Sequence, residues 1–367
     1  MTAALTALAD TCARLVHRGE LVGWVAGVAD ADGQTVHAGG RRSLEGPAMT
    51  ADTQFAMSSN TKPLAGALAL RLVELGILDL DDPVEQWLPE LADPRVLTDP
   101  AAALDDTVPA EQPITVRHLL TMTPGFGWVS EPGPLATRLG ERGLEPGPWG
   151  PQMGPDEFLA RLGALPLANQ PGSAWRYHTS SDVLGVLLAR ATDRTVGELL
   201  SEHVLGPLEL TDTAFRGDPE RMATAYGPDD EGGLTPFPVP AGTYTRVPPF
   251  ESLAAGLVST VPDQLTFLAS LVGTAPALLS AESVADMRTD HLTAGQRVTA
   301  SGFLDADCGW GHHVEIRPHG LIGWAGGLGT IGYADPRTGR AAVVATQVSF
   351  DGPGTAQAFD AFWSLLD

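Results

Sequence analysis

The sequence is poor in lysine: it has a single one, Lys62, among 22 lysines and arginines. A general preference for arginine explains most of this imbalance, but it leaves open what Lys62 does that arginine cannot. Arginine stays charged in proteins, whereas a desolvated lysine can lose its proton near neutral pH and then act as a base. Lys62 is therefore the first candidate for a chemical role.

Cysteine is nearly absent as well, with Cys12 and Cys308 as its two examples. The sequence contains no Cys-x-x-Cys or Cys/His spacing, and none of its nine histidines lies in a His-Glu-x-x-His pattern. We expect two unpaired buried cysteines, no disulfide framework, no metal site and no cofactor.

Positive charge is scarce too, since 45 acidic residues give a formal net charge of -23. Nucleic acids and anionic membrane surfaces would repel such a chain, so neither is an expected partner. No apolar run is long enough to cross a bilayer, and the first residues lack the basic cluster and apolar run of a secretory signal. We expect a cytoplasmic protein and leave its oligomeric state open.

Patterns typical of strands lie near both ends of the sequence. They occur at residues 22–29 and 34–38, and again at 309–316, 321–334 and 341–348, while helical spacing and long loops dominate between them. The simplest packing is of the α/β (α+β) class, with one antiparallel sheet built from both chain ends, flanked by helices. We expect residues 1–65 and 252–367 to form this sheet lobe, residues 66–251 to form a mainly helical lobe, and the cleft between them to hold the active site.

The chemistry centres on residues 55–64, with the sequence FAMSSNTKPL. Ser59 and Lys62 are three residues apart at the start of a helical run, a spacing that places both side chains on one helix face with their Cβ atoms roughly 5–6 Å apart. A serine hydroxyl is a weak nucleophile until a base lies beside it. Because no Gly-x-Ser-x-Gly pattern offers another nucleophile, the pair predicts Ser59 as nucleophile and Lys62 as its base.

Four more segments follow this pair in a recognisable order: residues 114–125, 175–185, 206–215 and 324–327. Together they resemble the landmarks of the serine β-lactamase-related hydrolases, a family that includes class C β-lactamases, DD-peptidases and family VIII esterases. The resemblance covers about residues 20 to 350. Five ordered landmarks are far more specific than one Ser-x-x-Lys motif.

The resemblance implies a role for each matching residue. Ser59 resembles the acylated nucleophile, Lys62 the general base, and Tyr177 the tyrosine that passes a proton to the leaving group. That last role asks for a phenol whose pKa is lowered by a nearby cation, for which Lys62 is the available lysine. The resemblance also implies an oxyanion hole formed by the N–H groups of Ser59 and Gly327, with Gly326 letting the strand approach the substrate.

Two expected substrate-binding positions depart from the family pattern. Thr179 stands where asparagine is common, and threonine lacks the two donors of the amide. Trp324 stands where a lysine or histidine is associated with recognition of a substrate carboxylate. A neutral indole cannot form that ion pair, so the replacement favours neutral substrates.

These features predict a serine hydrolase that works through an acyl-Ser59 intermediate, in the simplest case a carboxylesterase acting on small neutral esters. An acyltransferase with the same intermediate, a D-amino-acid peptidase or weak β-lactamase, and a non-catalytic acyl-binding relative remain alternatives. The expected partner is a small-molecule ester or acyl compound. We expect aromatic loop residues to shape an apolar acyl pocket: Trp87, Phe126, Trp128, Trp149, Tyr244 and Phe250.

Overall fold

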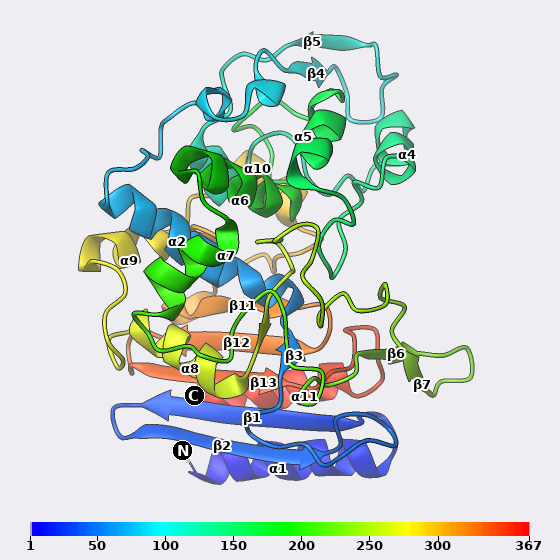
Figure 1. Cartoon of the computed structure of the whole chain (residues 1–367), viewed down its shortest axis with the longest axis vertical. Helices are drawn as coiled ribbons and strands as arrows, with labels where there is room; N and C mark the ends of the chain where they lie inside the picture. The colour runs from blue at the N-terminus through cyan, green and yellow to red at the C-terminus, as the bar shows by residue number, and fades with distance from the viewer. Residues whose placement is uncertain (1, 367) are drawn as a thin grey trace.

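The centre of the computed structural model, which describes residues 2–366, is a seven-stranded sheet (Figure 1). The strand order is β2-β1-β13-β12-β11-β10-β9, and all neighbouring strands run antiparallel. The first two strands come from the start of the chain and the others from its end, which confirms the expected fold class. Their bounds are β1 (Gly23–Asp30), β2 (Gly33–Gly40), β9 (Gly309–Trp310), β10 (Glu315–Ile316), β11 (Ile322–Gly326), β12 (Thr330–Asp335) and β13 (Arg340–Ala345).

Alternating side chains of the sheet divide between two cores, as the twofold period of a strand requires. Val25 and Val343 belong to the core that includes α8 (Val261–Ser270). Val28 and Val344 belong to the core on the other face, formed with α1 (Thr2–His17) and α11 (Thr355–Phe362). The central strands β1 and β13 are therefore buried on both faces.

The two C-terminal runs 309–316 and 321–334 each contain two strands with a turn between them. β9 pairs with β10, and β11 pairs with β12, both antiparallel. The turns carry residues in the left-handed region, His313 with φ 62° and Gly329 with φ 89°. The sequence patterns predict unbroken strands over residues 309–316 and 321–334, and these two turns divide them.

The middle of the chain is mainly helical and lies on one side of the sheet (Figure 1). Its helices are α2 (Lys62–Glu74), α3 (Val116–Leu120), α4 (Pro134–Glu141), α5 (Pro155–Gly163), α6 (Thr179–Thr192) and α7 (Val196–Leu200); α9 (Ala281–Met287) and α10 (Ala294–Ala300) follow α8. Three small two-stranded sheets complete the fold: β3 (Phe55–Ala56) with β8 (Val258–Ser259), β4 (Arg95–Leu97) with β5 (Thr107–Pro109), and β6 (Tyr226–Pro228) with β7 (Leu234–Pro236). In Figure 1, β6 and β7 lie beside the main sheet.

The expected lobe boundary between residues 65 and 66 falls inside α2. This helix contacts β11 of the sheet as well as α6 of the helical part. We propose that the two-lobe division holds with α2 as an element shared by both lobes.

Both cysteines are buried and free, as expected. Among the described residues, no helix combines the length and the apolar character that crossing a membrane requires.

The end of β11 and the start of β12 pack against the backbone of Met57, in the segment that leads to Ser59. The hydroxyl of Thr330 donates to the carbonyl of Met57 at 3.0 Å. A Cβ atom at Gly326 would lie 2.1 Å from that carbonyl oxygen and 2.4 Å from Thr330 Oγ1, whereas the nearest atom to a Cβ at Gly327 would be 3.7 Å away. Only the first of these two glycines is therefore needed for the close approach of the backbones.

We predict that Gly326→Ala lowers the free energy of unfolding by about 1–3 kcal/mol, because the added methyl group forces β11 away from Met57. The neighbouring change Gly327→Ala is the matched control and should stay within about 0.5 kcal/mol of the wild type. Urea denaturation followed by circular dichroism measures both. Equal midpoints for the two variants would contradict the close approach at Gly326.

Candidate active site

The site begins where β3 ends and α2 begins. The N–H of Met57 donates to the carbonyl of Leu257 at 2.9 Å, which extends the pairing of β3 with β8 toward the site. A 3-10 turn, Ser58–Thr61, then leads directly into α2. Ser58 has φ 48°, a strained value for a residue that is not glycine. Such strain is common next to functional groups, and here it precedes Ser59.

Lys62 is the first residue of α2, and its side chain is completely buried. Its Nζ lies 2.9 Å from Ser59 Oγ, 2.7 Å from the carbonyl oxygen of Ala254 and 3.5 Å from Nδ1 of His178. The helical spacing thus brings the two residues into the hydrogen-bond contact that nucleophile activation requires.

Burial lowers the pKa of Lys62 to about 7, against the opposing effect of the Asp182 carboxylate. Burial also raises the pKa of Asp182. Its Oδ1 accepts hydrogen bonds from Ser252 Oγ at 2.6 Å and from the N–H of Ala254 at 3.2 Å. Ala254 therefore binds the carboxylate through its N–H and the amine through its carbonyl. Near neutral pH, a substantial fraction of Lys62 is a neutral amine that can accept a proton.

Tyr177 lies beside this pair. Lys62 Nζ is 4.5 Å from the centroid of its ring, and its hydroxyl forms a hydrogen bond with Ser59. Burial raises the pKa of Tyr177, although hydrogen bonds with Ser59 and Trp324 oppose this shift. The expectation that a cation lowers this pKa is wrong, because desolvation outweighs the stabilising contacts. Tyr177 is a phenol, not a phenolate, at neutral pH.

Trp324 contacts Tyr177 directly. Its indole Nε1 donates to the Tyr177 hydroxyl oxygen at 2.6 Å. The two rings belong to a cluster of buried aromatic residues that also contains Trp175 and Trp310. Trp324, at the position where the sequence resemblance implies a base, is thus a neutral hydrogen-bond donor to the tyrosine.

The remaining predicted residues lie at different distances from the reaction centre. Gly327 lines the same cavity as Ser59, whereas Gly326 packs behind the nucleophile and lies outside that lining. Across residues 2–366, the N–H groups of Ser59 and Gly327 donate to no backbone carbonyl. Both amides are therefore free to bind a substrate oxygen. Thr179, the first residue of α6, lines a neighbouring hollow instead.

The cavity next to Ser59 has a volume of about 660 Å³ and a mostly apolar wall. Of the six aromatic residues expected to shape it, Trp128 does so, Trp149 lines the neighbouring hollow of about 440 Å³, and the other four lie outside both linings. Most of the aromatic wall comes from segments that the sequence did not single out. Besides Tyr177 and Trp324, its phenylalanine, tyrosine and tryptophan members are Trp128, Phe237, Phe303, Tyr333, Phe350, Phe359 and Trp363.

Three residues around Lys62 were missed by the sequence reasoning. Ala254 contributes only its backbone, which leaves no signal in a sequence. His178 and Asp182 stand in a segment that carries the family resemblance, and the spacing of Asp182, five residues after Tyr177, could have marked it as a carboxylate near the site. His178 has φ 84°, and burial keeps the pKa of its ring well below the usual value, so it is neutral.

An antiparallel sheet, a buried lysine that begins a helix, a serine in the turn before it and a tyrosine beside both define the β-lactamase and penicillin-binding-protein class of fold. The model of the family described as Beta-lactamase matches residues 8–362. The chain belongs to this family.

Known relatives agree with this assignment. Protein Rv1367c of Mycobacterium tuberculosis is 37% identical over 81% of this chain and 78% of its own length. Esterase EstB of Burkholderia gladioli is 32% identical over 84% of this chain and 80% of its own length. Among solved structures, EstCE1, described as a hydrolase with promiscuous acyltransferase activity, matches with a TM-score of 0.82 and 26% identity over 99% of both chains.

Because Lys62 is the single lysine, its pKa can be measured without ambiguity. Protein labelled with [13Cε]lysine should show one lysine side-chain resonance that titrates near pH 7 in the NMR spectrum, well below the value of a solvated lysine. In Asp182→Asn the titration should move to lower pH, because the carboxylate that favours the charged amine is gone.

Asp263→Asn is the matched control for this titration. Asp263 is also buried and accepts hydrogen bonds, from Thr213 and the N–H of Asp212, but it does not contribute to the pKa shift of Lys62. Asp263→Asn should leave the pH at which the Lys62 resonance titrates unchanged. A resonance that titrates near the value of a free lysine in the wild type would contradict a buried neutral base.

Proposed function

We propose that the protein is a serine hydrolase that forms an acyl intermediate on Ser59 and acts mainly as a carboxylesterase on neutral esters. The observation that carries this proposal is the 2.9 Å contact between Ser59 Oγ and the buried Nζ of Lys62. A neutral amine at that distance can take the hydroxyl proton as the oxygen attacks a carbonyl carbon. The similarity to an esterase and to a hydrolase with acyltransferase activity supports the same chemistry.

In the proposed first step, Lys62 accepts the Ser59 proton while Oγ bonds to the ester carbon. The N–H groups of Ser59 and Gly327 bind the oxygen that becomes negative. The proton then passes from Lys62 through the Tyr177 hydroxyl to the leaving alkoxide, and the carbon–oxygen bond of the ester breaks. In the second step, the oxygen of water or an alcohol bonds to the acyl carbon and gives its proton to the same pair. The bond between Ser59 Oγ and the acyl carbon then breaks, and the proton returns to Ser59 Oγ, which releases the acid or the new ester.

The composition of the cavity supports neutral substrates. Arg317, a cation in its wall, is already paired with Glu315 at 3.2 Å and with Asp305 at 3.1 Å, and it stacks on Trp363. Trp324 offers no charge. A substrate carboxylate would therefore find no free cation there, which argues against a peptidase or an efficient β-lactamase.

Ser59→Ala should reduce turnover of p-nitrophenyl butyrate by at least about 10³-fold, with an unchanged circular dichroism spectrum. Ser58→Ala is the matched control: this neighbouring serine is also buried, and its hydroxyl has no hydrogen-bond partner among the described residues. The loss of turnover in Ser58→Ala should be far smaller than in Ser59→Ala. Turnover retained in Ser59→Ala would exclude the acyl-serine mechanism. A wild type that binds the ester without turnover would instead support a non-catalytic acyl-binding protein.

A second candidate function is acyl transfer with the same intermediate. The volume of about 660 Å³ and the aromatic wall leave room for an apolar alcohol beside a short acyl group. Butanol added to the ester assay should then divert part of the product from butyrate to butyl butyrate, and the ratio of the two products separates transferase from hydrolase. Butyrate alone at every butanol concentration would eliminate the transferase.

Trp324→Phe should lower kcat by about 2- to 10-fold, the effect of losing one hydrogen bond to the Tyr177 hydroxyl while an aromatic ring is kept. Trp310→Phe is the control, because this buried indole packs against Trp324 but its Nε1 has no partner among the described residues. If both variants lose the same activity, the effect comes from packing and not from the hydrogen bond.

A further inference from the structure

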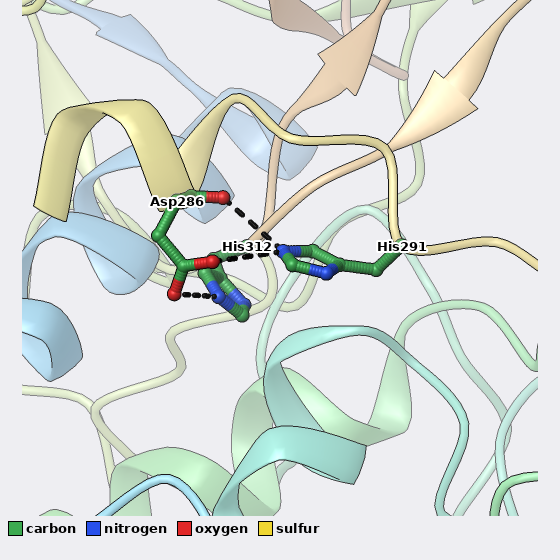
Figure 2. A group of neighbouring side chains, drawn as sticks. All are labelled: Asp286, His291 and His312. Carbon is green, nitrogen blue, oxygen red and sulfur yellow. Dashed lines mark hydrogen bonds and ion pairs between the residues drawn. The ribbon is translucent and has the colours of Figure 1, made fainter. Parts of the chain in front are cut away.

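A second cluster of titratable side chains lies apart from the candidate active site. Asp286 comes from the last turn of α9, His291 from the segment after it, and His312 from the turn between β9 and β10. Figure 2 shows the three side chains pointing toward one another. We propose that Asp286, His291 and His312 form a binding site for a zinc ion.

The distances between the ligand atoms fit such an ion. His312 Nε2 lies 2.9 Å from Asp286 Oδ2, and His291 Nε2 lies 3.5 Å from Asp286 Oδ1. Bonds of about 2.0–2.1 Å from zinc to histidine nitrogen and carboxylate oxygen, in a tetrahedron, place neighbouring ligand atoms roughly 3.3 Å apart. All three ligand atoms lie within 4.8 Å of one another, so small rotations of the side chains suffice.

The backbone holds these three segments in place without a metal. The N–H of His312 donates to the carbonyl of Met287, next to Asp286, and the N–H of His291 donates to the carbonyl of Trp310, both at 3.0 Å. Asp290, the neighbour of His291, is anchored by an ion pair with Arg297. The ligands are therefore brought together by the fold and need little ordering when the ion binds.

The chemistry of the donors selects zinc over harder cations. Two imidazoles and one carboxylate suit zinc and related transition metals, whereas calcium and magnesium prefer sites made only of oxygen. His312 Nδ1 is buried and has no hydrogen-bond partner among the described residues. Moving the imidazole proton to Nδ1, which frees Nε2 for the metal, therefore breaks no hydrogen bond at Nδ1. The nearby cation Arg117 is already paired with Asp81 at 2.9 Å.

One coordination position would face solvent. The His312 side chain is fully buried, but the side chains of His291 and Asp286 are 18% and 37% exposed. Water can take the fourth position. The ion would join α9, the segment after it and the turn between β9 and β10. The carbonyl of His312 in that turn packs against Gly66 of α2, where a Cβ atom would lie only 2.3 Å away. The role of the metal would be to stabilise the wall behind the helix that carries Lys62.

The test is a calorimetric titration of the full chain, without a histidine tag, with zinc chloride at pH 7.5. The wild type should bind one zinc ion per chain and unfold at a higher temperature when zinc is present. His291→Ala and Asp286→Asn should each weaken binding by at least about 10-fold. His17→Ala, which removes an exposed histidine of α1, should bind like the wild type.

Cobalt gives a second readout, since a tetrahedral site produces intense visible absorption that His291→Ala should abolish. Hydrolysis of p-nitrophenyl butyrate by the variants, or their circular dichroism, shows that they are folded. Absence of saturable zinc binding in the wild type would overturn the proposal, as would equal affinity in His291→Ala and His17→Ala. The zinc titration does not depend on whether Ser59 is a nucleophile.

Discussion

The rest of the site depends on an amine held without water in the protein interior. Desolvation favours the neutral form of Lys62, yet the group still needs hydrogen-bond partners, which Ser59, His178 and the carbonyl of Ala254 supply. Asp182 opposes the loss of charge, but its own carboxyl is buried, which also raises its pKa. Desolvation lowers the pKa of Lys62 and the Asp182 carboxylate raises it, and together they bring it near the pH at which a general base is most effective. Arginine could not replace it, because its charge would persist.

Much of this arrangement could be predicted from the sequence because it is local. Ser59 and Lys62 are separated by one turn of helix, so their contact follows from helical geometry once α2 is recognised. The antiparallel sheet built from both ends follows from the distribution of strand-like runs, and β1 indeed pairs with β13. Trp324 was identified as a departure from the family because it stands at a fixed place in an ordered motif.

The parts that could not be predicted depend on long-range packing. The carbonyl of Ala254 reaches Lys62 because β8 pairs with β3, and a backbone acceptor has no sequence signature. The aromatic wall draws on Phe303, Phe350 and Phe359, which come from three separate segments near the end of the chain. The same holds for His291 and His312, whose spacing matches no metal motif. The raised pKa of Tyr177 was missed because the degree of burial is a property of the fold, not of the residue.

Tyr177 and Trp324 together explain how a neutral site can move protons. Burial raises the pKa of the Tyr177 phenol, so it is protonated and cannot serve as the base; the proposed mechanism therefore assigns removal of the serine proton to Lys62. Tyr177 can then relay a proton, gaining one as it gives one away, and any negative charge that builds on its oxygen is stabilised by the indole N–H at 2.6 Å. The resemblance implies a lysine or histidine at the position of Trp324, and such a cation can form an ion pair with a substrate anion. An indole donates a hydrogen bond to the tyrosine without carrying a charge, so under the proposed mechanism it is compatible with the proton relay and gives a substrate anion no ion-pair partner.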